Sequence, residues 1–364
     1  MTVAAAVVAA VLGVGAGGAH AAPPSVADQE HRLADQIADG VHSRSAGPIT
    51  ESTVADPRSI AADTAGNGPA QNSWLTATAH GLVQPDVAPP GTNDWGCRPS
   101  RAHPEPIVLV HGTWVTAYET FAYLSGPLKD AGYCVFTFNY GRENVLDGGG
   151  LGTVLPGRSG VGDMTVSAQQ VGAFVDRVLD ATGARKVNIV AHSQGAPVSR
   201  WYLKFGGGAD KVDHEITLAG TNHGTTLGGI AWLGRLVTNA GLDVLAPTGL
   251  LVGRSGVQQI VGSDFLNRLN ADGDTVPGVD YTVIGTRYDE VATPYDLTFL
   301  RPGPGAQVRN ITLQDGCELD MSDHLSILYS PRALSLVLNA LDPGRTPQPR
   351  CGFNPWLIGG GGGI

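Results

Sequence analysis

A serine between small residues is the feature of the sequence that most directly suggests chemistry. Ser193 follows a short apolar run and stands in the pentapeptide Ala191-His192-Ser193-Gln194-Gly195. A strand that turns sharply into a helix at a serine forms a nucleophile elbow, and the turn needs small residues two places before and after that serine. Ala191 and Gly195 meet this requirement, and no other serine has Ala or Gly at −2 together with Gly at +2. An ordinary strand–helix turn is the alternative in a chain with 51 glycines, so the other parts of a site must decide.

A histidine that activates the serine is expected late in the chain. Along a chain with a nucleophile elbow, the serine is followed first by an acid and then by the histidine. The histidines after Ser193 are His214, His223 and His324. Only His324 also follows a segment that can supply the acid, and its polar loop leads into an apolar segment. We therefore expect His324 to be the base.

The acid is expected just past the carboxyl end of a strand, because ligands bind at that edge of a parallel sheet. Asp289 stands there, directly after the expected strand 281–285. Glu290 is its neighbour and Asp323 adjoins His324 in sequence, and both are read as solvated surface acids. The prediction is therefore a Ser193–His324–Asp289 triad, in which Asp289 fixes the imidazole tautomer and stabilises the imidazolium.

Acyl transfer through a serine also needs two preorganised donors for the developing oxyanion. One is the backbone N–H of the residue after the nucleophile, Gln194. The other is expected from the loop after the first core strand, where His111-Gly112-Thr113 follows the apolar segment 106–110. The N–H of Thr113 is the candidate.

The elements that must position these residues alternate along the chain as strand, helix, strand. This order predicts a mostly parallel sheet flanked by helices. Besides the run before Ser193, the segments expected as strands are 106–110, 134–138, 215–219, 281–285 and 306–313. Segments with the apolar spacing of helices are 118–131, 163–182, 196–205 and 331–341. Residues 225–262 are apolar with helical spacing but have no strand partner nearby.

Composition and the N-terminus limit the class of protein. The chain has 364 residues, 42% of them hydrophobic, which is enough to bury a large core. A net charge of −10 argues against nucleic acid and against polybasic docking on anionic membranes. Residues 1–21 carry an uncharged apolar run that ends in an A-x-A pattern, as in a secretory signal peptide. A membrane anchor is the alternative, but the run is short and glycine-rich for a span.

Four cysteines in a chain of this kind suggest two disulfides. They are Cys97, Cys134, Cys317 and Cys351, and three pairings are possible. We expect the local pairing, Cys97 with Cys134 and Cys317 with Cys351. No pair has C-x-x-C spacing, which disfavours a zinc or dithiol site.

With these residues assembled, the chain resembles the secreted bacterial class 2 lipases of the α/β-hydrolase superfamily, especially the actinobacterial triacylglycerol lipases. The resemblance covers residues 96–340 and includes Ala at the first small position of the elbow. The segments that carry it are 110–113, 138–141, 191–195, 218–224, 265–270, 286–291 and 323–324. It implies the α/β-hydrolase fold, an apolar acyl site, and no metal or organic cofactor.

The expected organisation is a signal peptide (1–21), a flexible leader (22–95), a catalytic domain (96–352) and a flexible tail (353–364). Residues 225–262 form either a lid-like insertion or an ordinary pair of packed helices. The expected function is a secreted serine ester hydrolase that cleaves fatty-acyl esters such as triacylglycerols through an acyl-enzyme. The alternatives are an acyltransferase, a polyester depolymerase, or a scaffold that binds lipid or a partner without turnover. We expect transient contact with lipid interfaces and no stable membrane anchor.

Overall fold

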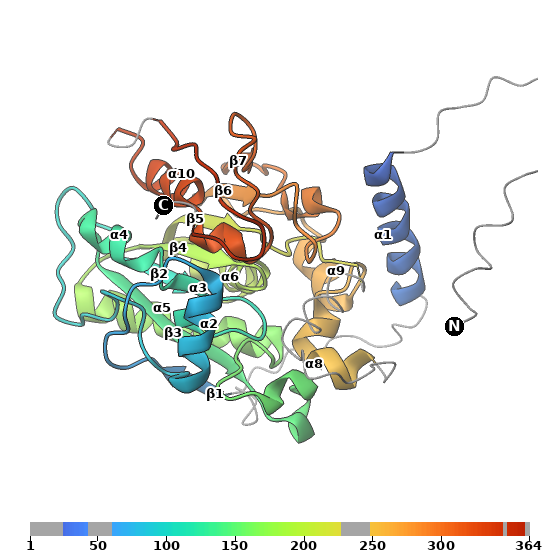
Figure 1. Cartoon of the computed structure of the whole chain (residues 1–364), viewed down its shortest axis with the longest axis horizontal. Coiled ribbons are helices and arrows are strands. Elements are labelled where there is room, and N and C mark those ends of the chain that lie inside the picture. Colours follow the sequence, from blue (N-terminus) through green and yellow to red (C-terminus); the bar gives the residue numbers. More distant parts are fainter. Residues whose placement is uncertain (1–24, 43–59, 227–247, 345–347, 361–364) are drawn as a thin grey trace, which may run out of the picture.

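The computed structural model describes residues 25–42, 60–226, 248–344 and 348–360, and its centre is a seven-stranded sheet (Figure 1). The strand order is β1-β3-β2-β4-β5-β6-β7, with β1 antiparallel to β3 and the other neighbours parallel. The strands are β1 Ile60–Asp63, β2 Ile107–Val110, β3 Val135–Arg142, β4 Val187–His192, β5 Val212–Leu218, β6 Asp280–Gly285 and β7 Gln307–Thr312. The predicted parallel sheet flanked by helices is confirmed.

Helices lie along both faces of the sheet and at its edges. The α-helices are α1 Val26–His42, α2 Trp74–Val83, α3 Ala117–Phe121, α4 Ser125–Asp130, α5 Met164–Thr182, α6 Gly195–Phe205, α8 Thr248–Gln258, α9 Asp264–Asn270 and α10 Pro331–Leu341. Short 3-10 turns are η1 Val145–Asp147, η2 Leu151–Val154, η3 Gly208–Asp210, η4 Tyr295–Thr298 and η5 Ser326–Tyr329. Among these described residues, no helix is both long and apolar enough to cross a bilayer.

The core lies on both faces of the sheet, because successive side chains of a strand point to opposite sides. In β2, Ile107 and Leu109 join one apolar cluster, whereas Val108 and Val110 join the other. The first cluster includes residues of α3 and α10, and the second includes residues of α5 and α6. All four β2 side chains are buried, as the continuous apolar run predicts.

Helix α5 illustrates how local sequence sets an element's ends. Asp163 caps its first turn by accepting from the N–H of Thr165 at 2.8 Å, and Gly183 ends it with a left-handed φ of 73°. The predicted helix 118–131 differs, because it is two short helices, α3 and α4. A capping box between Thr116 and Glu119 starts α3.

The expectation of a flexible leader over 22–95 is wrong for residues 60–95. Strand β1 pairs with β3, and Trp74 of α2 is buried in the core. The side chain of Asn93 accepts from the N–H of Thr137 and donates to its carbonyl, at 2.8 and 2.9 Å. The polar composition of this segment suggests mobility, but its polar side chains satisfy the backbone of the sheet.

The structure also bears on the expected C-terminal tail and on the 225–262 insertion. Residues 353–360, expected as part of a flexible tail, are held by two hydrogen bonds. The N–H of Leu357 donates to the Asp323 carboxylate, and the carbonyl of Ile358 accepts from the N–H of Trp74. Residues 1–24, 227–247 and 361–364 lie outside the described residues, and with them the expected signal peptide and much of the 225–262 insertion. Within the described part of that insertion, α8 is kinked at Gly253.

Both disulfides join cysteines that are close in sequence. The Cys97–Cys134 bond ties the segment before β2 to the start of β3. The Cys317–Cys351 bond ties the loop after β7 to the segment that follows α10. This is the local pairing of the three that are possible.

Candidate active site

Ser193 stands at the turn between β4 and α6 with a left-handed φ of 52°. Such a conformation costs energy in a non-glycine residue, and the packing around the turn must hold it in place. A Cβ at Gly195 would lie 2.4 Å from the carbonyl oxygen of Val110 and 2.7 Å from that of His111. Glycine is therefore the residue that lets α6 approach β2 this closely. Ala191 is fully buried in the strand before the turn.

The structure brings Ser193, His324 and Asp289 together from three separate loops. The Nε2 atom of His324 lies 2.9 Å from Ser193 Oγ, and its Nδ1 atom lies 3.0 Å from both carboxylate oxygens of Asp289. Asp289 also accepts from the N–H groups of Val291 and Ala292 at 2.9 and 2.7 Å. These two backbone hydrogen bonds fix the orientation of the Asp289 carboxylate toward the imidazole. All three side chains are at least nine-tenths buried.

Asp323 holds the loop that carries His324. Its carboxylate accepts from the N–H groups of Leu325 and Ser326 and from the hydroxyl of Ser326, and its second oxygen accepts from Leu357 N–H. The prediction of a solvated surface acid is wrong for Asp323, which is fully buried. This set of hydrogen bonds to Asp323 was not recognisable from the sequence, because one of its donors, Leu357, comes from the C-terminal segment.

The loop after β2 is fixed by a neutral histidine. Burial lowers the pKa of His111 to about 3. Its Nε2 accepts from the N–H of Tyr140 at 3.1 Å, so its Nδ1 carries the proton and donates to the carbonyl of Gly112 at 2.8 Å. Because a trans peptide is planar, holding the Gly112 carbonyl aims the N–H of Thr113 the opposite way. Within the described chain, the N–H groups of Thr113 and Gln194 have no intramolecular acceptor.

Gln259, directly after α8, contacts the same loop and was not singled out from the sequence. Its amide oxygen accepts from the hydroxyl of Thr221 at 2.9 Å, and its amide nitrogen donates to Thr113 Oγ1 at 2.9 Å. The Thr113 hydroxyl therefore uses a lone pair on Gln259 and keeps its own hydrogen to donate elsewhere. Gln259 and Thr113 are 146 residues apart, so no local pattern connects them.

Gln194 is positioned through its side chain. The hydroxyl of Tyr140 lies 3.0 Å from Gln194 Oε1 and 2.7 Å from the carbonyl of His111, and Gln194 Nε2 donates to Gly160 at 3.0 Å. These contacts join the residue after Ser193 to the loop that carries Thr113. The two predicted oxyanion donors thus belong to one buried network.

The histidines and the acid that were not chosen for the triad make other contacts. His214 lies 2.9 Å from the hydroxyl of Thr282. His223 lies 3.0 Å from Asp274, outside the Ser193 cluster. Glu290 follows Asp289, but no hydrogen bond joins its carboxylate to His324 Nδ1 in the described structure, and its oxygens are buried. The prediction of a solvated surface acid is therefore also wrong for Glu290.

Glu290 gives a testable dependence of stability on pH. Burial, with Asp323 and Asp289 nearby, raises the pKa of Glu290 to about 9. An unfolded glutamate has a pKa near ~4.3, so between these values the folded state binds more protons and stability falls as pH rises. We expect Glu290→Gln to raise Tm by roughly 2 °C or more at pH 8 and by less at pH 5, measured by calorimetry.

The control for this prediction is Glu318→Gln, because Glu318 is exposed and pairs with Arg287 at the surface. It should change Tm little at either pH, since exposed ion pairs contribute at most about 1 kcal/mol. An equal Tm shift for Glu290→Gln at pH 5 and pH 8 would contradict a neutral, buried Glu290.

A small cavity lies beside Ser193. Its lining combines the predicted oxyanion loop with α8 and the loop after β6. The lining residues are Thr113, Trp114, Ser193, Thr225, Gly256, Gln259 and Val291. Ser193, the predicted oxyanion loop and the apolar side chains of Trp114 and Val291 therefore meet in one space.

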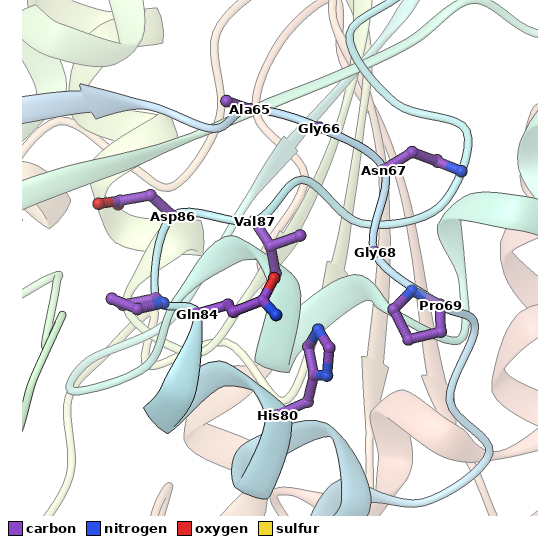
Figure 2. A pocket seen from close by; sticks show the side chains of 10 residues that line it. Ala65, Gly66, Asn67, Gly68, Pro69, His80, Gln84, Asp86 and Val87 are labelled. Atoms are coloured by element: carbon purple, nitrogen blue, oxygen red, sulfur yellow. The ribbon is translucent and has the colours of Figure 1, made fainter.

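A larger and more open hollow lies elsewhere, between the chain after β1 and the end of α2. Figure 2 shows Gly66, Gly68 and Pro69 on one side, with His80 and Gln84 on the other. None of the residues predicted for the site lines it, and its lining includes no serine or cysteine nucleophile. It does not offer the chemistry that Ser193 does.

The sheet, its elbow after β4 and its acid and histidine loops define an α/β-hydrolase fold. The model of the family "Lipase (class 2)" matches residues 104–318, which is more than half of the chain. The chain therefore belongs to the class 2 lipase family. The family resemblance inferred from the sequence is confirmed.

Individual relatives match more narrowly. A triacylglycerol lipase of Pseudarthrobacter phenanthrenivorans is 32% identical over 121 residues, covering 32% of this chain and 33% of that protein. A triacylglycerol lipase of Burkholderia plantarii is 32% identical over 121 residues, covering 32% and 29%. Each match thus spans about a third of the relative. The crystal structure of Aspergillus fumigatus lipase B is similar in fold, with a TM-score of 0.52, 21% identity, and coverage of 84% of this chain and 66% of that one.

Proposed function

We propose that the protein is a serine ester hydrolase that cleaves fatty-acyl esters such as triacylglycerols. The observation that carries the proposal is the pair of hydrogen bonds that joins Asp289 to His324 and His324 to Ser193, at 3.0 and 2.9 Å. Family membership and the names of the two triacylglycerol lipases support the substrate class. Trp114 and Val291, which line the small cavity beside Ser193, are apolar surfaces that an acyl group can contact.

The geometry supports a two-step mechanism. His324 Nε2 takes the proton of Ser193 as Oγ attacks the acyl carbon, and Asp289 stabilises the imidazolium. The oxyanion accepts from the N–H groups of Gln194 and Thr113 and from the free hydroxyl hydrogen of Thr113. His324 then returns the proton to the leaving alcohol. Water, activated by the same imidazole, hydrolyses the acyl-enzyme.

Turnover of simple esters tests this function. We expect the purified protein to hydrolyse p-nitrophenyl esters of rising acyl length and an emulsified triglyceride, and to release free fatty acid. Folded protein that cleaves none of these esters would contradict hydrolysis and favour a scaffold that only binds. Acyl groups captured by an added alcohol in preference to water would favour acyl transfer.

Gln259 is proposed to be a positioning residue for the oxyanion donors. In Gln259→Glu, a carboxylate oxygen would replace the amide donor and accept the Thr113 hydroxyl, which would then turn away from the oxyanion. We expect kcat to fall roughly 10- to 100-fold with little change in KM, because a misplaced transition-state contact affects mainly the chemical step. Steady-state kinetics on a soluble ester measure both constants.

Gln307→Glu is the matched control, since Gln307 is exposed at the start of β7. It should leave kcat unchanged. A Gln259→Glu protein with wild-type kcat and normal melting would refute the positioning role.

We also propose that the protein acts outside the cell. The signal-peptide pattern of residues 1–21 and the two disulfides support secretion, because structural disulfides persist in oxidising compartments. N-terminal sequencing of protein recovered from the culture medium should begin near Ala22. Recovery of the full chain from the cell interior alone would contradict this.

A further inference from the structure

The segment that follows the Cys317–Cys351 disulfide lies against the loop that carries His324. The disulfide ties the start of this segment to the chain that follows β7. Asn354 stands three residues beyond Cys351, and its carbonyl accepts from the N–H of Met321 at 3.0 Å. The segment therefore meets the chain just before the histidine.

Asn354 contacts both sides of His324 through one side chain. The residue is fully buried. Its amide nitrogen donates to Ser322 Oγ at 2.7 Å and to the carbonyl of Ser326 at 3.0 Å. Ser322 stands two residues before His324 and Ser326 two residues after it. One amide group therefore spans the stretch of backbone that carries the imidazole.

The contacts of Ser322 fix which way this amide faces. The hydroxyl of Ser322 donates its single hydrogen to the carboxylate of Asp320, so its oxygen can only accept from Asn354. The carbonyl of Ser326 is also an acceptor. Both neighbours thus require the NH₂ group of the amide, which has two hydrogens to donate. An ionised carboxylate at this position could satisfy neither of them.

Ser322 also links this contact to the acid of the proposed triad. Its carbonyl accepts from the hydroxyl of Thr286 at 2.5 Å. Thr286 directly follows β6, and its own carbonyl accepts from the N–H of Asp289 at 3.2 Å. The loop of His324 and the loop of Asp289 are therefore held together at Ser322, next to the Asn354 contact.

The histidine loop has other supports, so the loss of Asn354 should shift this loop rather than unfold it. Burial lowers the pKa of His192, and its neutral ring donates through Nε2 to the carbonyl of His324 at 2.9 Å. The carboxylate of Asp323 accepts from the N–H of Ser326 at 2.7 Å. These contacts remain without Asn354, but nothing then joins the two sides of the loop through a single group.

We propose that Asn354 is a positioning residue for His324. The imidazole must direct Nε2 at Ser193 Oγ and Nδ1 at Asp289 at the same time, so a small shift of its backbone weakens both contacts. By joining Ser322 to Ser326, Asn354 keeps that backbone in place. The inference rests on the proposed function, because the step that it affects is proton transfer by His324.

Removing the amide tests this role. In Asn354→Ala, we expect kcat per active site for p-nitrophenyl butyrate to fall roughly 10- to 100-fold with little change in KM, because a displaced base affects mainly the chemical step. Complete reaction with a fluorophosphonate counts the active sites in each sample. The rate constant of that labelling should fall by a similar factor. A purely structural residue would lower the number of labelled sites and leave kcat per site unchanged.

Asn354→Asp keeps the shape of the side chain and removes both donors. Its carboxylate would face two oxygen acceptors, Ser322 Oγ and the carbonyl of Ser326. We expect kcat per active site to be at least as low as in Asn354→Ala. Because active sites are counted in each sample, partial unfolding of either variant does not hide the result. Wild-type kcat per active site in either variant would overturn the proposal.

Asn310→Ala is the matched control. The side chain of Asn310 also makes two hydrogen bonds, with the N–H and the carbonyl of Leu300 at 3.1 and 2.8 Å. Asn310 lies in β7 and belongs to none of the loops of the site. The variant should keep wild-type kcat per active site, whatever it does to Tm. Equal losses of kcat per active site in Asn310→Ala and Asn354→Ala would contradict a specific role of Asn354.

Failure of the proposed function would look different. Wild-type protein that reacts with the fluorophosphonate but cleaves no ester would refute hydrolysis. The labelling rates would then still decide the role of Asn354, since at least tenfold slower labelling of Asn354→Ala supports it and equal rates refute it. Wild-type protein that cleaves esters with the same kcat per active site as Asn354→Ala would support hydrolysis and refute the positioning role.

Discussion

Replacing Ser193 with alanine is expected to lower the rate constant for ester cleavage by about 10⁶-fold, the loss that removal of a triad nucleophile causes. The side chain contributes the attacking atom, and no neighbouring group in the described cavity can replace it. Residual turnover would come from the oxyanion donors acting on water. Initial rates on p-nitrophenyl butyrate, compared at equal enzyme concentration, measure the effect.

Ser199→Ala is the control for this prediction. Ser199 is buried one to two turns further along α6, and its hydroxyl has no hydrogen-bond partner in the described structure. Its removal should leave turnover unchanged. More than about 1% of the wild-type rate in a well-folded Ser193→Ala protein would contradict nucleophilic catalysis by this serine.

Replacing Asp289 with asparagine is expected to lower turnover by about 10⁴-fold, as a wrong imidazole tautomer does in such triads. The amide nitrogen would donate toward His324 Nδ1 and force the proton onto Nε2, which then cannot accept the proton of Ser193. The amide oxygen can still accept from the N–H groups of Val291 and Ala292, so the loop should remain folded. Steady-state kinetics and a melting curve of the same sample separate the two effects.

Glu290→Gln is the control that tests whether Asp289 or its neighbour Glu290 is the acid of the triad. Its carboxylate is adjacent in sequence, but it makes no hydrogen bond to His324 Nδ1 in the described structure. It should keep turnover within a few-fold of wild type. If Glu290→Gln lost four orders of magnitude and Asp289→Asn did not, the acid assignment would be off by one residue.

The sheet and the order of the predicted site residues could be inferred from local sequence. Strands buried on both faces of a parallel sheet are near-continuous apolar runs, so β2 was recognisable by composition alone. An elbow dictates that an acid and then a histidine follow it, which led to Asp289 and His324. The sheet is confirmed, and the structure places Asp289 and His324 beside Ser193, while their catalytic roles stay a prediction. Each inference depends on residues that are neighbours in the chain or on strand order.

The contacts that depend on distant segments could not be inferred. Gln259 lies in an apolar stretch, and its bond to Thr113 forms only when α8 packs on the loop after β2. Likewise, Asn93 completes the backbone hydrogen bonding of Thr137, although its own segment is polar and poor in apolar residues. Composition predicts burial of apolar side chains, but it does not predict which polar groups tertiary packing will satisfy.

The most direct test of the account is covalent labelling of the folded protein with a fluorophosphonate, followed by peptide mass spectrometry. The account predicts one phosphonyl adduct, on Ser193, formed at a rate that falls strongly in Asp289→Asn and abolished in Ser193→Ala. Folded protein that forms no adduct, or that carries the adduct on another serine, would contradict the proposed site.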